Sequence, residues 1–351
     1  MRAVPAILIA LGLAAAVLWA VMAFGGAQVM PSYLAAWLFW LAIPVGALAL
    51  VLALEFAGAG NSPITAGLRS LLFLLPFAAL LAILVLVRLD ALYAWSRAAP
   101  QQDLAPTWFS SGFFIARSVV YLVVWSVLAL VFMRPPPARL ADRGRSGLAG
   151  LGLILHLVIG SLAATDWAMS LDLGLGSSCF GLLLIAAQCS LALAAAILVR
   201  PALRDPALLP RSAALMLAVL ATWMFLHVMQ FLIVWSGDLP KEIVWYQRRD
   251  GGLGGAAEWL GFAAMVLALI VLLPGSRIRR PGAVMALAGL IVFAHLVEML
   301  WLVTPSYRGA FTISAADVLA LAGVGGVAYA AAWALARAWA PRTRRVQHGR
   351  A

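Results

Sequence analysis

Long apolar runs separated by short polar segments dominate the sequence. Each run has about the 20 residues that a helix needs to cross a bilayer, and none shows the strict alternation of a barrel strand. Because backbone polar groups inside a bilayer must be paired within the chain, the runs predict helices. We expect spans at residues 5–24, 31–55, 66–88, 108–133, 147–165, 176–199, 211–235, 256–274, 281–303 and 313–338. The predicted fold class is therefore all-α, a polytopic membrane protein with about ten transmembrane helices.

A faint internal repeat suggests how these spans are grouped. The tripeptide His-Leu-Val occurs at 156–158 and again at 295–297, at comparable distances from the same end of its span. This spacing fits a single membrane domain, residues 1–351, with one four-helix bundle at 31–165 and a second at 176–303. The spans at 5–24 and 313–338 would then flank the bundles.

The first span has two interpretations. Arg2 followed by an apolar stretch is also typical of a signal peptide. The stretch is long for that role, and no clear small-residue cleavage site follows it. We therefore favour a retained helix.

Composition and charge support a bilayer environment. Apolar residues make up 65% of the chain and charged residues only 11%, against about 25% charged residues in soluble domains. The formal net charge of +11 comes from short loops between the apolar runs, so it indicates topology and gives no reason to expect nucleic acid as a partner. Lys and Arg concentrate in alternate loops, which predicts a multi-pass protein with cytoplasmic N- and C-termini.

The segments predicted to face outward are unusually rich in Trp, Asp and Arg. They cover residues 88–108, 166–172, 235–246 and 301–308. An interfacial aromatic belt would explain the Trp and Tyr residues, but it does not explain the acids beside them. We therefore expect a partner on this face, contacted by Trp167, Ser170, Asp172, Trp235, Asp238, Glu242, Trp245, Tyr246 and Arg249.

Ionisable residues within the spans are costly and are candidates for function. Arg117, Tyr121 and Trp125 form one stripe of the fourth span, and His156 lies at similar depth in the next span. They could form a polar pocket that binds a quinone head group or relays protons. The alternative is a helix–helix contact in which Arg117 is held by an acid such as Asp166.

The second half of the chain carries a further set. Trp223, His227 and Gln230 share a face of the seventh span, and His295 and Glu298 form an i, i+3 pair in the ninth. A lone His on an apolar helix is usually a core residue. A metal would need more ligands than this pair supplies, whereas a proton relay needs only neighbouring titratable groups.

The remaining acids and cysteines favour structural roles. Glu258 and Asp317 are expected in the first turns of their helices, where an acid suits the helix dipole, and Glu55 is expected at a solvated helix end. Cys179 and Cys189 lie about 15 Å apart along one helix, too far for a disulfide. No catalytic nucleophile–base pair appears, and no metal, haem c or iron–sulfur site of the chain's own is expected.

Several ordered stretches resemble one known family. Asp166-Trp-Ala-Met-Ser-Leu-Asp172 resembles its motif DWxMSLxPHW, and residues 230–249 resemble its motif QxLIxWxGNxPEExxWYxxR. Residues 113–126 and 299–305 also fit. The family is the second polysulfide-reductase-like membrane subunit of alternative complex III, a bacterial quinol:cytochrome c oxidoreductase. Matching positions are Arg117, Asp166, Trp167, Ser170, Gln230, Trp235, Gly237, Pro240, Glu242, Trp245, Tyr246 and Arg249.

The sequence departs from the family pattern at three places. Leu173-Gly174-Leu175 stands where the first motif has Pro-His-Trp, Lys241 replaces the first Glu of the second motif, and Asp238 replaces its Asn.

The resemblance implies two four-helix bundles with two flanking helices. It also implies a multihaem cytochrome c, an iron–sulfur protein and a sister membrane subunit as partners.

The expected function is that of a non-catalytic membrane subunit that anchors outward-facing redox partners and conducts protons. In this reading the haem c and iron–sulfur clusters belong to the partner subunits. A quinone is a possible ligand of this chain, and membrane lipid surrounds it. The proton path would run through Arg117, His156, Asp166, His227, His295 and Glu298. A secondary transporter is the alternative, which Gly- or Pro-broken helices at matching positions would favour.

Overall fold

The computed structural model describes residues 3–24, 28–97, 107–135, 143–273 and 280–338, and all regular structure within them is helical. Residues 98–106 of the predicted outer segment and the Arg-rich stretch 339–351 lie outside the described residues. The helices are α1 (Ala3–Phe24), α2 (Met30–Phe56), α3 (Pro63–Arg69), α4 (Leu75–Val87), α5 (Leu89–Leu92), α6 (Ser111–Phe132), α7 (Arg143–Trp167), α8 (Phe180–Val199), α9 (Leu209–Gly237), α10 (Pro240–Gln247), α11 (Leu253–Leu272), α12 (Pro281–Val303), α13 (Pro305–Arg308) and α14 (Ala315–Ala338). Short 3₁₀ turns occur at Leu72–Leu74, Ala94–Ser96, Met169–Leu171 and Pro201–Arg204.

Nine helical segments in the described parts of the chain are long and apolar enough to cross a membrane. The protein is therefore an all-α, multi-pass membrane protein, as the sequence predicted. The remaining predicted span, residues 5–24, corresponds to α1, whose apolar stretch Ile9–Phe24 is shorter than the other nine.

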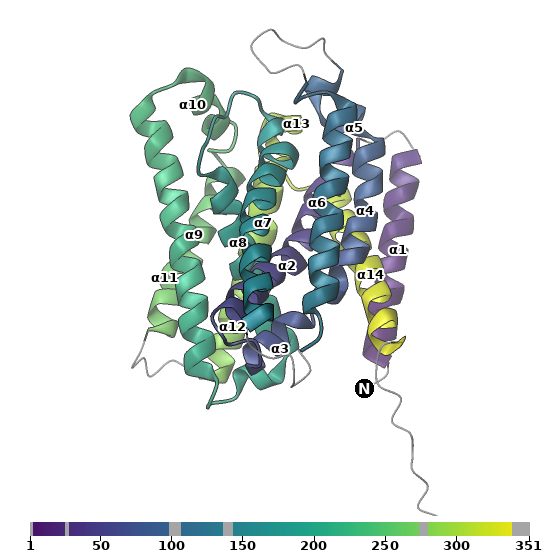
Figure 1. Cartoon of the computed structure of the whole chain (residues 1–351). Coiled ribbons are helices and arrows are strands. Elements are labelled where there is room, and N and C mark those ends of the chain that lie inside the picture. The colour runs from purple at the N-terminus through teal and green to yellow at the C-terminus, as the bar shows by residue number, and fades with distance from the viewer. Residues whose placement is uncertain (1–2, 25–27, 98–106, 136–142, 274–279, 339–351) are drawn as a thin grey trace, which may run out of the picture.

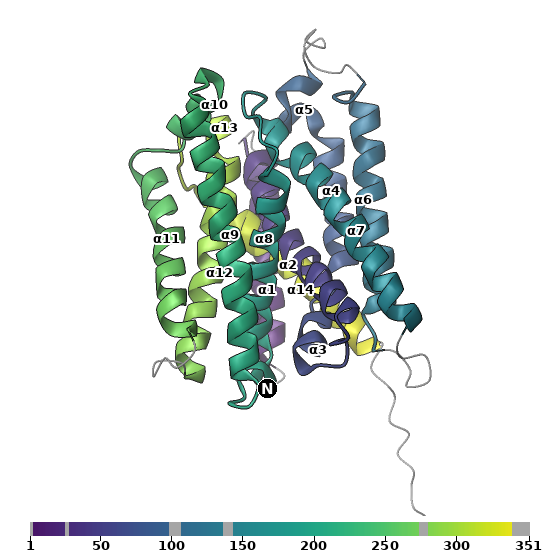
Figure 2. The ribbon, with the colours of Figure 1, turned by 60° about the vertical axis from the view of Figure 1, so that its left-hand side comes forward.

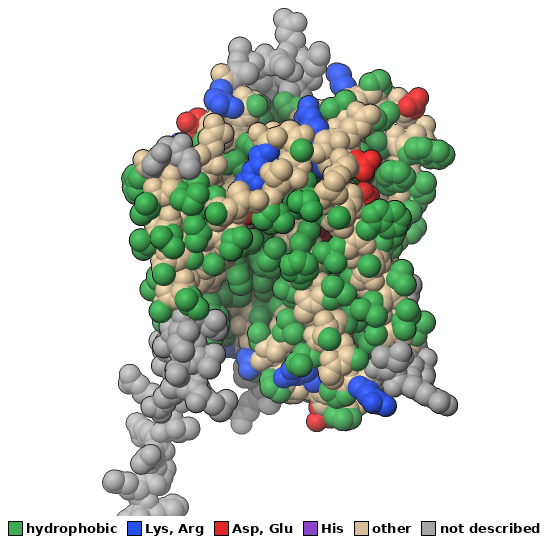
Figure 3. Space-filling model, turned by 180° about the vertical axis from the view of Figure 1, so that it is seen from behind, with side chains coloured by type: hydrophobic (Ala, Val, Ile, Leu, Met, Phe, Trp, Pro, Cys, Tyr) green, Lys and Arg blue, Asp and Glu red, His purple; other side chains and the backbone are tan. Residues whose placement is uncertain are grey.

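The long helices run between the same two ends of the molecule (Figure 1). One end carries α5, α10 and α13 and is called the α10 face; the other carries α3 and is called the α3 face. Helix α1 begins, and α14 ends, at the α3 face. Apolar side chains cover the middle of the molecule, and charged side chains gather toward its two ends (Figure 3). This distribution is the one that a bilayer requires.

For description, α2, α4, α6 and α7 are called the first group, α8, α9, α11 and α12 the second group, and α1 and α14 the flanking pair. In the first group α2 contacts α4, α6 and α7; in the second, α8 contacts α9 and α12, and α11 contacts α9 and α12. Contacts between the two groups are as extensive as those within them. The groups meet where α2 packs against α8 and α12, and α14 packs on α2 and α1. Figure 1 shows α9 and α11 at one edge of the molecule and α1 and α14 at the other, and Figure 2 shows the same bundle from a second side.

The central and peripheral helices differ strongly in burial. In an 18-residue window, 83% of α2 and 72% of α8 are buried, against 22% of α9 and 25% of α11. Helix α8 can approach α2 closely because Gly46 has no side chain: a Cβ there would lie 2.0 Å from the carbonyl oxygen of Gln188. The second group therefore presents α9 and α11 to its surroundings.

Proline explains the break in the third span. Pro76 lacks a backbone N–H and its ring crowds the preceding turn, and α4 begins at Leu75 after a 3₁₀ turn. Pro44 lies within α2, which nevertheless continues to Phe56. Helices α8 and α9 of the second group run without interruption, so the matched breaks that would favour a transporter are not found in these helices.

The flanking pair is joined by small residues. Gly12 of α1 meets Gly326 of α14 so closely that an added Cβ on Gly12 would lie 2.4 Å from the Gly326 Cα. Gly323 packs on the backbone of Ala16 in the same way. In membranes, where apolar surfaces gain little from burial, such close backbone packing is a main source of helix association.

Candidate functional site

The Arg117 cluster lies at the α10 face of the first group and is fully paired. The guanidinium of Arg117 donates from Nε and Nη2 to the two carboxylate oxygens of Asp166, at 3.0 and 2.9 Å. Nη1 donates to the Trp108 carbonyl at 2.9 Å, and the Trp108 ring lies 4.0 Å from the guanidinium carbon. Tyr121 donates to Asp166 at 3.1 Å. This bidentate, buried pair is the helix–helix contact that the sequence left open as an alternative.

His156 does not share that pocket, contrary to expectation. It lies on α7 ten residues before Asp166, which is about 15 Å along the helix. Arg117 is close to the start of α6 at Ser111, so it lies nearer the α10 face than predicted. His156 is completely buried beside Trp125, and neither of its ring nitrogens has a hydrogen-bond partner.

The turn after α7 is held by hydrogen bonds within the chain. Trp167 donates to Ser118 at 2.9 Å, and Ser170 donates to the Asp166 carbonyl at 2.5 Å. Asp172 forms an ion pair with Arg248 at 2.7 Å, which ties the turn to the end of α10. The two family-like motifs therefore meet in space.

Arg249 is buried beneath α10. Its guanidinium carbon lies 3.8 Å from the centre of the Trp245 ring, and its Nη2 donates to the Leu302 carbonyl at 2.8 Å. Nη2 also donates to Ser306, and Nη1 to the Trp245 carbonyl. Burial lowers the pKa of Arg249 to about 9, which still leaves the group charged near neutral pH. The residue therefore fastens α10 to the end of α12.

These findings correct part of the predicted partner-facing set. Trp167, Ser170, Trp245 and Arg249 are buried within the chain, because they make the internal contacts that hold the turns. Such residues can shape a docking surface but cannot themselves contact a partner. The exposed or half-buried members of the set are Asp172, Trp235, Asp238, Glu242 and Tyr246. Asp238 adopts a left-handed conformation, φ 47°, which ends α9.

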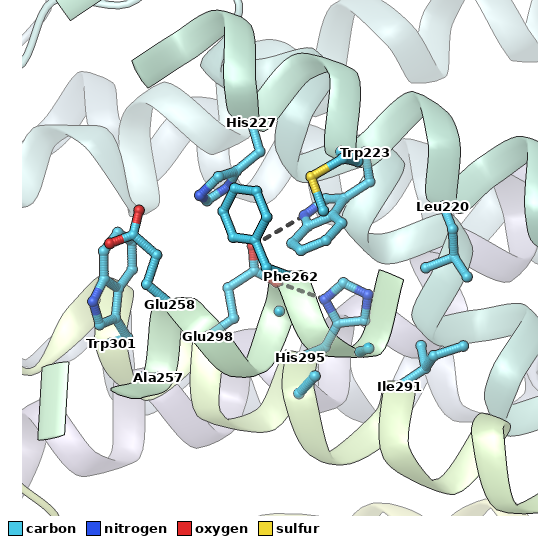
Figure 4. Close-up of a pocket in the computed structure, with 14 residues that line it drawn as sticks. Leu220, Trp223, His227, Ala257, Glu258, Phe262, Ile291, His295, Glu298 and Trp301 are labelled. Carbon is cyan, nitrogen blue, oxygen red and sulfur yellow. Dashed lines mark hydrogen bonds and ion pairs between the residues drawn. The ribbon is translucent and has the colours of Figure 1, made fainter. Parts of the chain in front are cut away.

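The second group brings its predicted residues together in one cluster. His295 Nδ1 lies 2.5 Å from Glu298 Oε2, and His295 Nε2 lies 2.6 Å from Ser190 Oγ on α8. Trp223 of α9 donates to the other Glu298 oxygen at 3.1 Å. Figure 4 shows the Trp223, His295 and Glu298 side chains of this network beside a small cavity between α9, α11 and α12. The cavity, of about 30 Å³, has room for only one or two water molecules.

His227 stands where three cavities meet. It lines the cavity beside Glu298, a second of about 20 Å³ toward Tyr246, and a larger one of about 490 Å³ between α9 and α11. Its Nδ1 is buried without a hydrogen-bond partner. Glu258 lines the first and third cavities, and in Figure 4 its carboxylate points away from the His295–Glu298 pair. The buried pair is thus connected, through His227 and Glu258, with the α10 face.

The acids at helix ends behave differently from one another. Asp317 lies in the first turn of α14, as predicted, and pairs with Arg308 at 2.8 Å. Glu258 lies one turn deeper than expected, because α11 begins at Leu253. Glu55 is not solvated: it is buried at the α3 face between Arg69 and Arg145. This interaction joins α2, α3 and α7.

Sequence reasoning missed several contributors to the second cluster. Ser190 carried no signal, because a serine on an apolar span has no distinguishing neighbour. Glu258 was assigned to a helix dipole, although its position within the span, deeper than a terminal acid, could have singled it out. In the described parts of the chain, no three His, Cys, Asp or Glu side chains gather closely enough to hold a metal ion.

The two polar clusters thus differ in chemistry. The Arg117–Asp166 cluster has its polar atoms paired within the chain, whereas the His295–Glu298 cluster borders a cavity.

In comparisons with known proteins, no protein-family model and no curated protein matches the chain.

Proposed function

We propose that this chain is a membrane subunit of a quinol:cytochrome c oxidoreductase resembling alternative complex III. In this role it anchors redox partners at its α10 face and carries a proton relay in its second helix group. The assignment to such a complex is supported by the ordered motifs at 166–172 and 230–249. It places the α10 face outside the bacterial inner membrane and both termini in the cytoplasm.

The observation that carries the relay is the geometry of the His295–Glu298 pair. The Ser190 hydroxyl has one proton; when it donates that proton to the Ala187 carbonyl, 2.9 Å away, its oxygen accepts a hydrogen bond from His295 Nε2. In that arrangement His295 Nε2 holds a proton. One further proton lies between Nδ1 and the Glu298 carboxylate, and the pair is electrically neutral whichever atom carries it. Such a coupled pair can release or regain one proton as a unit.

The cavities beside the pair lead toward the α10 face, because His227 and Glu258 line the space between the pair and that face. In the described residues of α8, α9, α11 and α12, the half nearer the α3 face has no acid or histidine within a span. In the proposed orientation, a proton bound by the pair therefore exchanges with the outer side of the membrane.

The anchoring role is tested by purification. The tagged chain is extracted from its native membranes in mild detergent, and the co-purifying proteins are identified by mass spectrometry. We expect c-type haem absorbance and an iron–sulfur partner. A colourless chain that purifies alone or only with itself would overturn the assignment and favour transport.

The relay is tested in the intact complex. Glu298→Gln keeps the size and hydrogen bonding of the side chain but removes its titration, so proton release per electron should fall. Asp205→Asn makes the same kind of change at an exposed acid that lines none of these cavities, and the amide oxygen can still accept from the Ala207 N–H, so proton release should stay unchanged. Equal proton release in the wild type and in Glu298→Gln would exclude the relay while leaving the anchoring role open.

A further inference from the structure

The larger cavity between α9 and α11, called the α9–α11 groove, has a lining unlike that of the buried pair. It holds about 490 Å³ and reaches the α10 face at Asp250. Its walls are aromatic: Phe231 and Tyr246 pack edge to face at 5.7 Å on one side, and Trp259 and Phe262 lie 5.9 Å apart on the other.

The carboxylates of Glu258 and Asp250 line the α9–α11 groove together with the His227 ring, and no Lys or Arg lines it. Asp250 accepts one hydrogen bond, from the backbone N–H of Gly251. Glu258 makes no hydrogen bond or ion pair with any described residue. An aromatic wall around carboxylates that no Lys or Arg neutralises is the chemistry that proteins use for organic cations.

The depth of the groove limits the kind of ligand. Glu258 is the sixth residue of α11, about 8 Å below the helix start, so its carboxylate lies within the span and not at its end. Helices α9 and α11 are the two least buried of the spanning helices in the second group. A ligand can therefore enter from the lipid side with an apolar body attached.

We propose that the α9–α11 groove binds an organic cation, an ammonium or phosphonium centre on an apolar body. The positive centre lies between Glu258 and Asp250 and faces the Trp259 and Phe262 rings. Two sources share this chemistry: the ammonium head group of a membrane phospholipid, and a free lipophilic cation. The site does not depend on the proposed redox assembly.

The first test uses tetraphenylphosphonium with the full chain, purified in detergent together with any partners. We expect saturable binding, and Glu258→Gln should weaken it about tenfold or more, because the cation loses its nearest opposite charge in a poorly solvated site. The matched control, Asp205→Asn, removes an exposed acid that does not line the groove and should bind within about twofold of the wild type. Absence of saturable binding, or equal binding by Glu258→Gln, would overturn the proposal.

A second pair of variants separates recognition from loss of fold. Trp259→Phe keeps an aromatic face and should retain most of the affinity, whereas Trp259→Ala should lose about fivefold. Trp259 is highly exposed, so neither change disturbs the core, and circular dichroism checks this. Equal affinities of the two variants would contradict a cation–ring contact.

The source is decided in nanodiscs of equal anionic content, containing either phosphatidylethanolamine or a neutral glycolipid. If the lipid head group is the natural occupant, tetraphenylphosphonium binds more weakly in the phosphatidylethanolamine discs, and native mass spectrometry finds that lipid on the wild type but not on Glu258→Gln. If a free cation is the occupant, affinity is the same in both discs. Each outcome supports the groove as a cation site.

Discussion

The two helix groups accommodate ionisable side chains inside the membrane in opposite ways. In the first group, Arg117 and Asp166 meet in a bidentate pair, and Tyr121 and Trp108 satisfy what remains. In the second, the His295–Glu298 pair borders a cavity, and His227 and Glu258 keep unpaired polar atoms beside it. Closed pairing stabilises helix packing, whereas open pairing leaves a group able to bind or titrate. The presence of a charge in a span therefore does not by itself identify a site.

The largest expected effect is the loss of the closed pair. Asp166→Ala leaves Arg117 buried without a counter-charge, which should lower the free energy of unfolding by about 3–5 kcal/mol. Denaturant unfolding in detergent, followed by circular dichroism, measures it. The double variant Arg117→Met, Asp166→Leu should regain most of that loss, because an apolar pair needs no counter-charge. A double variant no more stable than Asp166→Ala would show that the pair does more than join α6 to α7.

Access to thiol reagents distinguishes the open cluster from the closed one. In a chain with Cys179 and Cys189 replaced by alanine, His227→Cys should react with a small polar thiol reagent. It should react about tenfold faster than Ser118→Cys, because a thiol needs solvent access to ionise and react. Ser118 is fully buried in the first group although it lies nearer the α10 face. Equal reaction rates of the two introduced cysteines would contradict the proposed difference in solvent access between the two clusters.

His156 provides a test of the opposite sign. Its ring nitrogens are buried and unpaired, so His156→Leu removes an unsatisfied polar group and should raise the free energy of unfolding by about 1 kcal/mol. The same unfolding titration measures the change. The indole nitrogen of Trp125 is also unpaired. A clear loss of stability would mean that the His156 and Trp125 nitrogens bind a polar group that lies between the two rings.

The smallest effect is expected at the open pair itself. In Glu298→Gln the amide can donate to His295 Nδ1 and accept from Trp223, so every contact of the carboxylate has a replacement. The free energy of unfolding should change by less than about 1 kcal/mol. A loss comparable to that of Asp166→Ala would place Glu298 in the same structural class as Asp166 and weaken the relay proposal.

The fold was largely predictable from sequence, and the neighbours of each site residue were not. Span lengths follow from the bilayer, so the long spanning helices could be located to within a few residues, whereas the short helices α3, α5, α10 and α13 were not predicted. Which face of a span turns inward could not be read, because lipid-facing and buried positions are equally apolar here. The i, i+3 spacing of His295 and Glu298 was visible within one helix. Their contacts with Ser190 and Trp223 come from other helices and needed the three-dimensional packing.

The same limit explains the mistaken environments. Glu55 looked like a solvated helix end because its partners, Arg69 and Arg145, lie in separate segments of the chain. Trp245 and Arg249 looked like surface residues because they lie in a polar stretch, yet α10 folds back and buries them. Polar composition thus marks the ends of spans but does not reveal which polar residues are enclosed there.

The close contact between Gly12 and Gly326 has a consequence for biosynthesis. Helix α1 precedes all the other spans of this chain, and its main partner, α14, follows them, so the ribosome delivers the two partners far apart in time. Until α14 has inserted, the surface of α1 that will contact it faces lipid, which its apolar side chains allow. The contact then closes only after every intervening span has inserted, so a nascent chain arrested before α14 would expose the waiting glycine face of α1 to other helices in the membrane.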